Sequence, residues 1–292
     1  MPSFASVNGE ISPADQARVS VLDTGFVFGD GVYETLRTYS GRPFLLDRHL
    51  ARLRASAARL GFEVSRSDES LAREIDLLLS RAHNPESYIR IIVTRGAGDM
   101  SYRFDRVKGP TVAIVVKPFE PLPERYYTEG APVIISSIRR NHPRALDPAI
   151  KSCNLLNSVL SVREAQAAGA VEPILLNDAG DVAEGASSNV FIVKDSAALT
   201  PPLSAGILAG VTRALILELC SELGIPAREE TLRVADLVGA DEVFLTSTIR
   251  EALPVGTIDG KPVGDGRPGP LTLRILQAVR EYARRVSVPA RA

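Results

Sequence analysis

The sequence predicts two α+β domains joined by a proline-rich connection. Helical and strand patterns alternate along the 292 residues without a regular period, which argues against a solenoid and against a simple parallel crossover fold. Pro118, Pro121 and Pro123 lie within residues 117–130, where we expect an extended connection that joins neither a helix nor a central strand. We therefore place a first domain at residues 1–117, a linker at 118–130 and a second domain at 131–292.

Hydrophobic periodicity supplies the elements of the first domain. We expect a strand over 31–39, helices over 47–60 and 68–82, and strands over 88–94 and 111–119. Alternation in the strand 88–94 puts Ile89, Ile91 and Val93 on one face and Tyr88 with Arg90 on the other. Tyr88 and Arg90 therefore point together, either toward a substrate carboxylate or toward solvent.

The second domain continues in the same mixed manner. We expect strands over 131–138, 172–178, 189–194 and 241–247, helices over 146–165 and 211–223, and a last helix after Pro270. The helix over 146–165 carries Lys151 on the face of Leu155, Ser158 and Val162, which we expect to turn inward. We expect the chain end 286–292 to be frayed.

Composition excludes several classes of function. The formal charge of −1 gives no basic field for nucleic acid or acidic membranes, so a small-molecule partner is favoured. The three histidines have no metal-binding spacing, and the two glycine clusters lack the final glycine of a dinucleotide fingerprint. Two cysteines cannot build a disulfide framework, and no stretch has the pattern of a signal peptide or a membrane span. We expect a cytoplasmic protein that binds neither a metal ion nor nicotinamide.

Lys151 is the first candidate for chemistry. A lysine on an inward face either lays its aliphatic stem over apolar surface and keeps its charge in water, or presents a desolvated amine suited to a Schiff base. If Lys151 holds an aldehyde cofactor, pyridoxal phosphate (PLP) is the first to consider. PLP needs an anion beside its ring nitrogen, a cradle for its phosphate and a dry pocket.

The sequence offers a candidate for the anion and several for the cradle. Glu184 lies between a predicted turn at 178–180 and an apolar strand, where its carboxylate could keep the ring nitrogen protonated. The candidate phosphate contacts offer hydroxyl, guanidinium or helix-terminal amide donors: Arg52, Val211, Thr212, Ser247 and Thr248. Each candidate also has an interpretation without a ligand. Glu184 could be a surface glutamate and Arg52 a solvated helix arginine, while the threonine at 212 could mark an ordinary helix start and the hydroxyls at 247 and 248 a common run at a strand end.

Several sequence blocks occur together in one order. They are His-x-x-Arg-Leu at 49–53, Ile-Lys-Ser-x-Asn-Leu-Leu-Asn at 150–157, Glu-Gly-Ala-Ser-Ser-Asn-Val-Phe at 184–191, Gly-Val-Thr-Arg at 210–213 and Thr-Ser-Thr at 246–248. From "FVFGDGVYETLR" to "TSTIREALPVGTIDG", this set resembles the class IV aminotransferases. The resemblance implies a PLP enzyme of fold type IV, with a small N-terminal α/β domain and a larger C-terminal α/β-barrel-like domain. It also implies a homodimer, because active sites of this family borrow a loop from the neighbouring subunit.

The resemblance also assigns roles to residues. Lys151 would be the Schiff-base lysine and would move a proton from the substrate α-carbon to C4′ of the cofactor, for which its free amine must be neutral. Glu184 would be the partner of the pyridine nitrogen. The other predicted cofactor contacts are Arg52, Ser187, Val211, Thr212, Ser247 and Thr248. The predicted substrate contacts are Tyr33, Tyr88, Arg90, Thr248 and Ile249.

Motifs that select the substrate are mixed. Tyr88-x-Arg90 resembles the branched-chain group, in which the tyrosine serves the α-carboxylate and the arginine serves the side carboxylate of glutamate. The Arg-x-His that D-amino acid enzymes carry after Thr-Arg-Gly is missing here. Leu156, however, replaces the tyrosine that branched-chain enzymes commonly place five residues after the lysine. Arg103 and Arg250 could supply a carboxylate site that no motif predicts.

We therefore predict a transaminase that exchanges the amino group of a branched-chain L-amino acid with 2-oxoglutarate. The nearest alternative is a D-amino acid or (R)-amine transaminase of the same fold. A lyase that releases pyruvate from aminodeoxychorismate is a rival enzyme, and an α+β binding module with a merely structural lysine is the alternative without catalysis.

Overall fold

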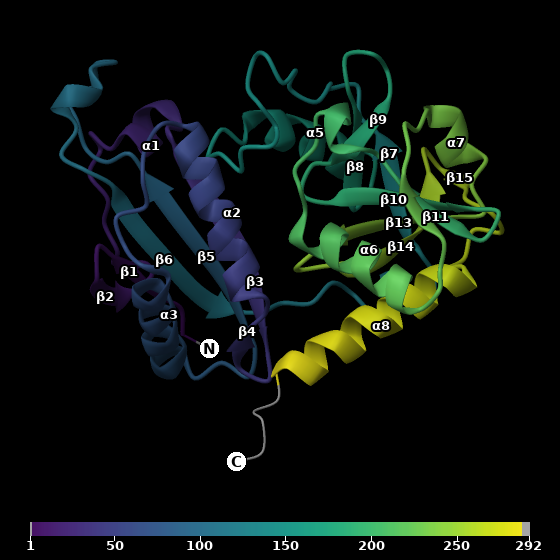
Figure 1. Cartoon of the computed structure of the whole chain (residues 1–292), viewed down its shortest axis with the longest axis horizontal. Helices are drawn as coiled ribbons and strands as arrows, with labels where there is room; N and C mark the ends of the chain where they lie inside the picture. Colours follow the sequence, from purple (N-terminus) through teal and green to yellow (C-terminus); the bar gives the residue numbers. More distant parts are fainter. Residues whose placement is uncertain (1, 288–292) are drawn as a thin grey trace. The chain divides into compact units, whose positions relative to one another are not determined.

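The computed structural model describes residues 2–287, which form two compact units (Figure 1). Within the described residues, unit 1 comprises 2–120, 150–154 and 283–287, and unit 2 comprises 121–149 and 155–282. Unit 1 thus runs three residues past 117, where the sequence predicts the first domain to end. Lys151 belongs to unit 1, although it falls within the predicted second domain at 131–292.

Unit 1 contains a six-stranded antiparallel sheet in the order β2-β1-β6-β5-β3-β4. Its strands are β1 (Phe4–Val7), β2 (Glu10–Pro13), β3 (Gly31–Tyr39), β4 (Arg42–Pro43), β5 (Ser87–Thr94) and β6 (Thr111–Pro118). Its helices are α1 (Thr24–Phe28), α2 (Leu46–Arg59), α3 (Asp68–Ala82) and the single-turn η1 (Phe104–Arg106). The predicted elements of the first domain are confirmed to within one residue at each end.

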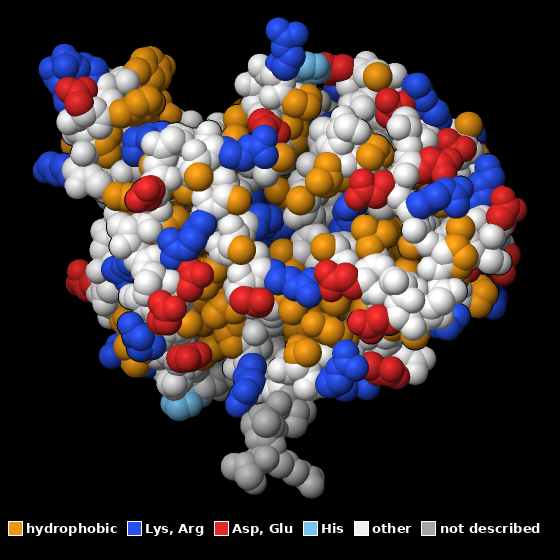
Figure 2. Space-filling model, viewed as in Figure 1, with side chains coloured by type: hydrophobic (Ala, Val, Ile, Leu, Met, Phe, Trp, Pro, Cys, Tyr) orange, Lys and Arg blue, Asp and Glu red, His pale blue; other side chains and the backbone are white. Residues whose placement is uncertain are grey.

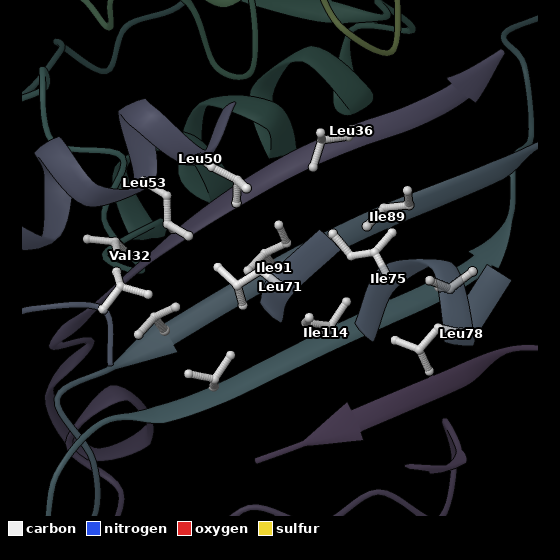
Figure 3. Close-up of a cluster of buried hydrophobic side chains, with 14 of the residues drawn as sticks. Val32, Leu36, Leu50, Leu53, Leu71, Ile75, Leu78, Ile89, Ile91 and Ile114 are labelled. Carbon is white, nitrogen blue, oxygen red and sulfur yellow. The ribbon is translucent and has the colours of Figure 1, made fainter. Parts of the chain in front are cut away.

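The core of unit 1 lies between the sheet and the helices α2 and α3. Figure 3 shows side chains of the two helices facing those of β3, β5 and β6. Ile89 and Ile91 are fully buried, as the period of two in β5 predicts, because alternate side chains of a strand point to opposite faces. Helix α3 begins at its predicted residue, where the Ser67 side chain accepts a hydrogen bond from the Ser70 amide. This packing fixes β3 and α2, which carry Tyr33 and Arg52.

Unit 2 is built on a nine-stranded mixed sheet that curls into a half-barrel, in keeping with the barrel-like second domain that the sequence resemblance implies. Eight strands follow the order β12-β11-β10-β13-β14-β7-β8-β9, and β15 pairs with β14. The strands are β7 (Ala131–Ile135), β8 (Glu172–Leu176), β9 (Val182–Gly185), β10 (Asn189–Lys194), β11 (Ala197–Thr200), β12 (Ala227–Glu229), β13 (Glu242–Ser247), β14 (Glu251–Ile258) and β15 (Lys261–Pro262). Parallel pairs such as β7 with β8 occur beside antiparallel pairs such as β10 with β13, which explains the irregular order of helices and strands in the sequence.

The remaining helices are α4 (Arg125–Thr128), α5 (Leu156–Ala167), η2 (Leu203–Ala205), α6 (Val211–Glu222), α7 (Val234–Val238) and α8 (Pro270–Ser287). Helix α6 and strands β10 and β13 agree with the predicted 211–223, 189–194 and 241–247. In the middle of the sheet the rings of Phe191 and Phe244 stack with centroids 4.9 Å apart. Val286 and Ser287 belong to α8, so the predicted fraying is wrong for these two residues, and 288–292 lie outside the described residues.

Two sequence-based expectations about local structure are wrong. The predicted extended connection contains α4, because its prolines precede the helical turn, where a missing amide hydrogen costs nothing. Pro123 and Glu124 supply carbonyls that accept hydrogen bonds from the amides of Tyr126 and Tyr127. Pro118 ends β6, which pairs with both β1 and β5, so the proline does close a central strand.

Lys151 lies outside a helix, contrary to the second expectation. Helix α5 starts at Leu156, and its buried residues are Ser161 and Ala165 rather than the predicted inward face. The segment before it pairs with β3 instead: the Tyr33 amide donates to the Lys151 carbonyl at 2.9 Å, and the Cys153 amide donates to the Gly31 carbonyl at 2.8 Å. Backbone groups that serve this strand-like pairing cannot also serve a helix.

The described part of the chain contains no helix that is both long and apolar enough to cross a membrane. It also contains no group of three or more His, Cys, Asp or Glu side chains arranged to hold a metal ion. Figure 2 shows acidic and basic side chains interspersed over the visible face of both units, in keeping with the formal charge of −1.

Candidate active site

The amine of Lys151 lies against the aromatic ring of Tyr33. Lys151 Nζ is 4.5 Å from the ring centroid and 3.5 Å from the Tyr33 hydroxyl. The lysine backbone is held from two sides, since its carbonyl accepts from the Tyr33 amide and its amide donates to Ser56 Oγ at 3.2 Å. Two separate elements, β3 and α2, therefore position a half-buried amine.

Arg90 and Tyr88 join this cluster, as the alternation in β5 predicts. The Arg90 guanidinium carbon lies 4.1 Å from the centroid of the Tyr33 ring, and Arg90 Nη1 donates to the Tyr88 hydroxyl at 3.3 Å. The Tyr33 ring thus contacts both the Lys151 amine and the Arg90 guanidinium. A guanidinium, an amine and two hydroxyls within one cluster make a favourable place for a carboxylate, because Arg can bind it through two parallel hydrogen bonds.

Arg52 belongs to a buried network that the sequence analysis missed. Arg52 Nε donates to Glu34 Oε1 at 2.7 Å, and Arg52 Nη2 donates to Glu34 Oε2 at 2.8 Å. His49 Nδ1 lies 2.7 Å from Glu34 Oε2, and both Glu34 and His49 are fully buried. A detectable signal was present: the period of two in β3 puts Glu34 at a core position between Val32 and Leu36.

The charge state of this network follows from its contacts. Burial raises the pKa of Glu34, but the hydrogen bonds from Arg52 and His49 and the charge of Arg52 outweigh it and hold the pKa at about 2. Burial lowers the pKa of His49 more than its contact with Glu34 raises it. His49 is therefore neutral near pH 7, and its Nδ1–H group donates a hydrogen bond to the ionised Glu34.

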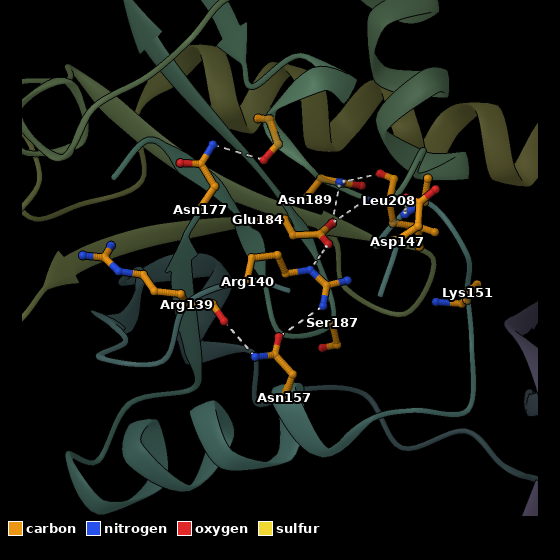
Figure 4. A network of polar contacts seen from close by, with 12 residues as sticks. Arg139, Arg140, Asp147, Lys151, Asn157, Asn177, Glu184, Ser187, Asn189 and Leu208 are labelled. Carbon is orange, nitrogen blue, oxygen red and sulfur yellow. Dashed lines mark hydrogen bonds and ion pairs between the residues drawn. The ribbon is translucent and has the colours of Figure 1, made fainter. Parts of the chain in front are cut away.

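In unit 2, the buried carboxylate of Glu184 is held by three donors (Figure 4). Glu184 Oε1 accepts from Arg140 Nε at 2.8 Å, and Oε2 accepts from Asn189 Nδ2 at 3.2 Å and from the Leu208 amide at 3.0 Å. Arg140 Nη1 also donates to Asn157 Oδ1 at 3.3 Å. Glu184 is not a surface glutamate, and a fixed carboxylate of this kind can keep a pyridine nitrogen protonated.

Arg140, Asn157 and Asn189 were not predicted as site residues. Asn189 stands inside the block Glu-Gly-Ala-Ser-Ser-Asn-Val-Phe, five residues after Glu184, so a buried polar residue at the start of a strand could have been noticed. Arg140 lies 44 residues from Glu184, and no local pattern links the two.

The start of α6 brings together three of the predicted phosphate contacts. Val211 is the first residue of the helix, and no side chain caps it, because the N-cap residue is Gly210. A Cβ at Gly210 would lie 1.9 Å from Asn189 Oδ1, so this position requires glycine. The hydroxyls of Thr212 and Thr248, both buried, are 3.5 Å apart. An open helix N-terminus beside two hydroxyls suits a phosphate.

Other predicted contacts of unit 2 have different surroundings. The Ser247 hydroxyl accepts from the Arg250 amide at 3.2 Å, and Ile249 is half-buried. The Ser187 hydroxyl contacts both Glu172 and Arg250. Leu156 is the first residue of α5 and is 68% exposed.

The predicted residues are divided between the two units. Unit 1 carries Arg52, Lys151 and the substrate-contact candidates Tyr33, Tyr88 and Arg90. Unit 2 carries Glu184, Ser187, Val211, Thr212, Ser247, Thr248 and Ile249. Arg103 pairs with Asp105 on the surface of unit 1. Each unit carries groups that fit PLP: unit 1 has an amine, and unit 2 has a fixed buried carboxylate and an uncapped helix start beside two hydroxyls.

Several known proteins are similar to this chain over most of its length. Residues 31–258 match the family model of the amino-transferase class IV proteins. A Methanocaldococcus jannaschii protein assigned as a branched-chain-amino-acid aminotransferase is 38% identical over 278 residues, 94% of each chain. A D-alanine aminotransferase of Bacillus licheniformis is also 38% identical, over 273 residues and 94% of each chain. The crystal structure of a T.th. branched-chain amino acid aminotransferase with pyridoxamine 5′-phosphate has a TM-score of 0.92 at 30% identity, covering 99% of this chain and 96% of that one.

Proposed function

The chain belongs to the class IV aminotransferases, and from this premise we propose that it exchanges the amino group of a branched-chain L-amino acid with 2-oxoglutarate. Class IV aminotransferases are enzymes that use PLP. Membership in this family therefore excludes the alternative of a binding module without catalysis. The choice of substrate rests on one observation: Arg90 is hydrogen-bonded to Tyr88 and stacked on the ring that contacts the Lys151 amine. This cluster offers donors for the carboxylates of an amino acid and of glutamate.

We propose specific roles for the residues that bind PLP. When bound, PLP supplies an aldehyde that accepts the amino group and a ring that withdraws electrons from the bonds at the substrate α-carbon. Lys151 would carry the cofactor, and Glu184, fixed by Arg140, would face the ring nitrogen. Contacts to the phosphate are assigned to Arg52, Val211, Thr212 and Thr248, and less direct contacts to Ser187 and Ser247.

The groups of unit 1 would carry out proton transfer and substrate binding. The Lys151 amine would take the proton from the substrate α-carbon as a general base. Its contacts with Tyr33 and its two-sided backbone attachment support this role, because a positioned base transfers a proton faster than a mobile one. Tyr88 would bind the α-carboxylate, and Arg90 the side carboxylate of glutamate or 2-oxoglutarate.

A half-reaction panel tests the substrate assignment. We expect L-leucine to convert bound PLP to its amino form, seen as a loss of visible absorbance, much faster than D-alanine or (R)-1-phenylethylamine. Arg90→Met should raise the KM for 2-oxoglutarate about 30-fold, since roughly 2 kcal/mol of charged hydrogen bonding is lost. Arg37→Met is the matched control, because Arg37 also stacks on aromatic rings of this sheet yet has no proposed role. Rapid conversion by D-alanine with none by L-leucine would overturn the assignment.

A D-amino acid or (R)-amine transaminase is the second candidate. It is favoured by Leu156 in place of the tyrosine, and by the D-alanine aminotransferases among the relatives. In the same panel this candidate predicts fast reaction with the D- or (R)-amine. The lyase alternative predicts pyruvate release from aminodeoxychorismate without any oxo-acid acceptor.

A homodimer in the cytoplasm completes the proposal. Two segments of unit 1, one that contains α1 and one that contains η1, lie side by side. The Thr24 amide donates to the Gly96 carbonyl, and the Gly98 amide donates to the Leu22 carbonyl. They expose large apolar side chains, namely Val21, Leu22, Phe26, Met100, Tyr102 and Phe104. Such a patch supports association, because monomers rarely leave it in water. Light scattering should give twice the chain mass for the wild type and less for Phe26→Glu.

Both cysteines are free, which supports a reducing compartment.

A further inference from the structure

We propose that Arg250 and Glu172 form a buried clamp that positions Thr248 for the cofactor phosphate. The inference rests on the proposed function, in which Thr248 contacts that phosphate. It also assigns Arg250, which the sequence left as a possible substrate-carboxylate ligand, to a positioning role. All of the contacts that form the clamp lie within unit 2.

Glu172 is a buried carboxylate with every oxygen engaged. It lies on β8 and is 1% exposed. Its Oε1 accepts from the Ser187 amide at 2.7 Å, the Ser187 hydroxyl at 3.0 Å and the Ser188 hydroxyl at 3.0 Å. Its Oε2 lies 2.9 Å from Arg250 Nη2. Because an unpaired buried charge is costly, Glu172 holds these donors firmly.

Arg250 connects this carboxylate to the loop that carries Thr248. Its Nη1 donates to the Ser187 hydroxyl at 2.6 Å, so the planar guanidinium spans Glu172 and Ser187 together. Its backbone amide donates to the carbonyl and hydroxyl of Ser247, and its carbonyl accepts from the Tyr127 hydroxyl at 3.1 Å. One residue therefore ties the loop after β9, which follows Glu184, to the turn after β13, which contains Thr248.

The turn after β13 depends on outside contacts for its shape. Glu251 has φ of +59°, in the left-handed region that non-glycine residues rarely adopt. Its carboxylate accepts from Arg280 Nε at 2.8 Å, which holds the far end of the turn. Strained backbone persists only where surrounding contacts fix it, so removal of the Arg250 contacts should let the turn relax and displace Thr248.

The same contacts argue against Arg250 as a substrate ligand. Its side chain is only 16% exposed, and its guanidinium already serves a fully buried carboxylate and a serine hydroxyl. A two-bond contact between these same nitrogens and a substrate carboxylate would compete with the bonds to Glu172 and Ser187. A positioning role is consistent with all of its contacts.

Equilibrium dialysis of the full chain against PLP and against pyridoxal, which lacks the phosphate, tests the clamp. We expect Arg250→Met to weaken PLP binding about tenfold and pyridoxal binding less than about twofold, because only the phosphate contact is misplaced. Glu172→Gln should act in the same direction, and the double variant should lose less than the product of the two single losses. Arg228→Met is the matched control, since Arg228 forms an exposed pair with Glu230 and should leave both affinities unchanged.

Two further variants separate the possible outcomes. Arg250→Lys keeps the charge but cannot span Glu172 and Ser187, so it should fold and lie between wild type and Arg250→Met in PLP affinity. A lower melting temperature with an unchanged ratio of pyridoxal to PLP dissociation constants would show a merely structural pair and overturn the clamp. Thr248→Ala probes the proposed function separately: if it lowers PLP affinity while Arg250→Met and Arg250→Lys do not, only the clamp fails. If Thr248→Ala has no effect, the phosphate assignment itself is wrong.

Discussion

Each unit holds one predicted functional group through an ion pair. The charges are reversed between the units, because the functional group is the arginine in unit 1 and the carboxylate in unit 2. In unit 1 a buried carboxylate, Glu34, fixes the arginine expected at the phosphate, Arg52. In unit 2 an arginine, Arg140, fixes the carboxylate expected at the ring nitrogen, Glu184. The partners in unit 1 are 18 residues apart on one strand and the next helix, whereas those in unit 2 are 44 residues apart. Each of these functional groups is held by a partner of opposite charge, and only the local partner, Glu34, leaves a pattern in the sequence from which it could have been found.

Removing the buried partner in unit 1 should have the largest effect. Glu34→Gln removes the negative charge and one of the two acceptor oxygens that Arg52 and the neutral His49 share, so we expect a loss of about 3–5 kcal/mol in the free energy of unfolding, measured by urea denaturation. Glu230→Gln, which breaks an exposed pair with Arg228, should cost less than about 0.5 kcal/mol. Equal losses in the two variants would refute the central role of Glu34.

Removing the holding partner in unit 2 should act on the rate. Arg140→Met leaves Glu184 with the weaker donors Asn189 and Leu208, so we expect kcat to fall about 100-fold as the carboxylate loses its position. The neighbouring Arg139→Met is the control, because only the Arg139 backbone carbonyl contacts Asn157, and kcat should stay within about twofold. A normal kcat in Arg140→Met would mean that Glu184 needs no such support.

The pH dependence of stability should reflect the buried Glu34–His49 pair of unit 1. The folded-state pKa of His49 lies below its ordinary 6.5, so the unfolded chain binds this proton first and stability falls as pH drops below about 6.5. The slope from this group is at most about 1.4 kcal/mol per pH unit. The pKa of Glu34, about 2 against an ordinary 4.5, adds a further loss below about pH 4.5. His49→Gln keeps a donor for Glu34 and should flatten the curve between pH 6.5 and 5; an unaltered curve would exclude His49 as its source.

Arg103 should show the smallest effect. It pairs with Asp105 at the surface and is 61% exposed, so Arg103→Met should change the unfolding free energy by less than about 0.5 kcal/mol. We also expect the KM for 2-oxoglutarate to change less than about twofold, in contrast to Arg90→Met. A tenfold rise in this KM would identify Arg103 as the missing carboxylate ligand.

The sequence predicts most of the fold because its periodic signals are local. The alternation in β5 placed Tyr88 with Arg90, and the helical pattern over 68–82 gave α3 without error. The setting of Lys151 could not be found this way, because the contacts that exclude a helix there come from β3, more than a hundred residues earlier. Arg140 and Glu172 were missed for the same reason: their partners are brought to them by sheet topology, which composition and spacing do not encode.

Reductive trapping is the most direct test of the proposal that Lys151 carries the cofactor. The purified protein would be treated with borohydride, digested and analysed by mass spectrometry, with Lys151→Ala as the parallel sample. We expect a pyridoxyl group on Lys151 in the wild type and its loss in the variant, because Lys151 presents a half-buried amine held by β3 and α2. A pyridoxyl group on another residue, or none at all, would contradict it.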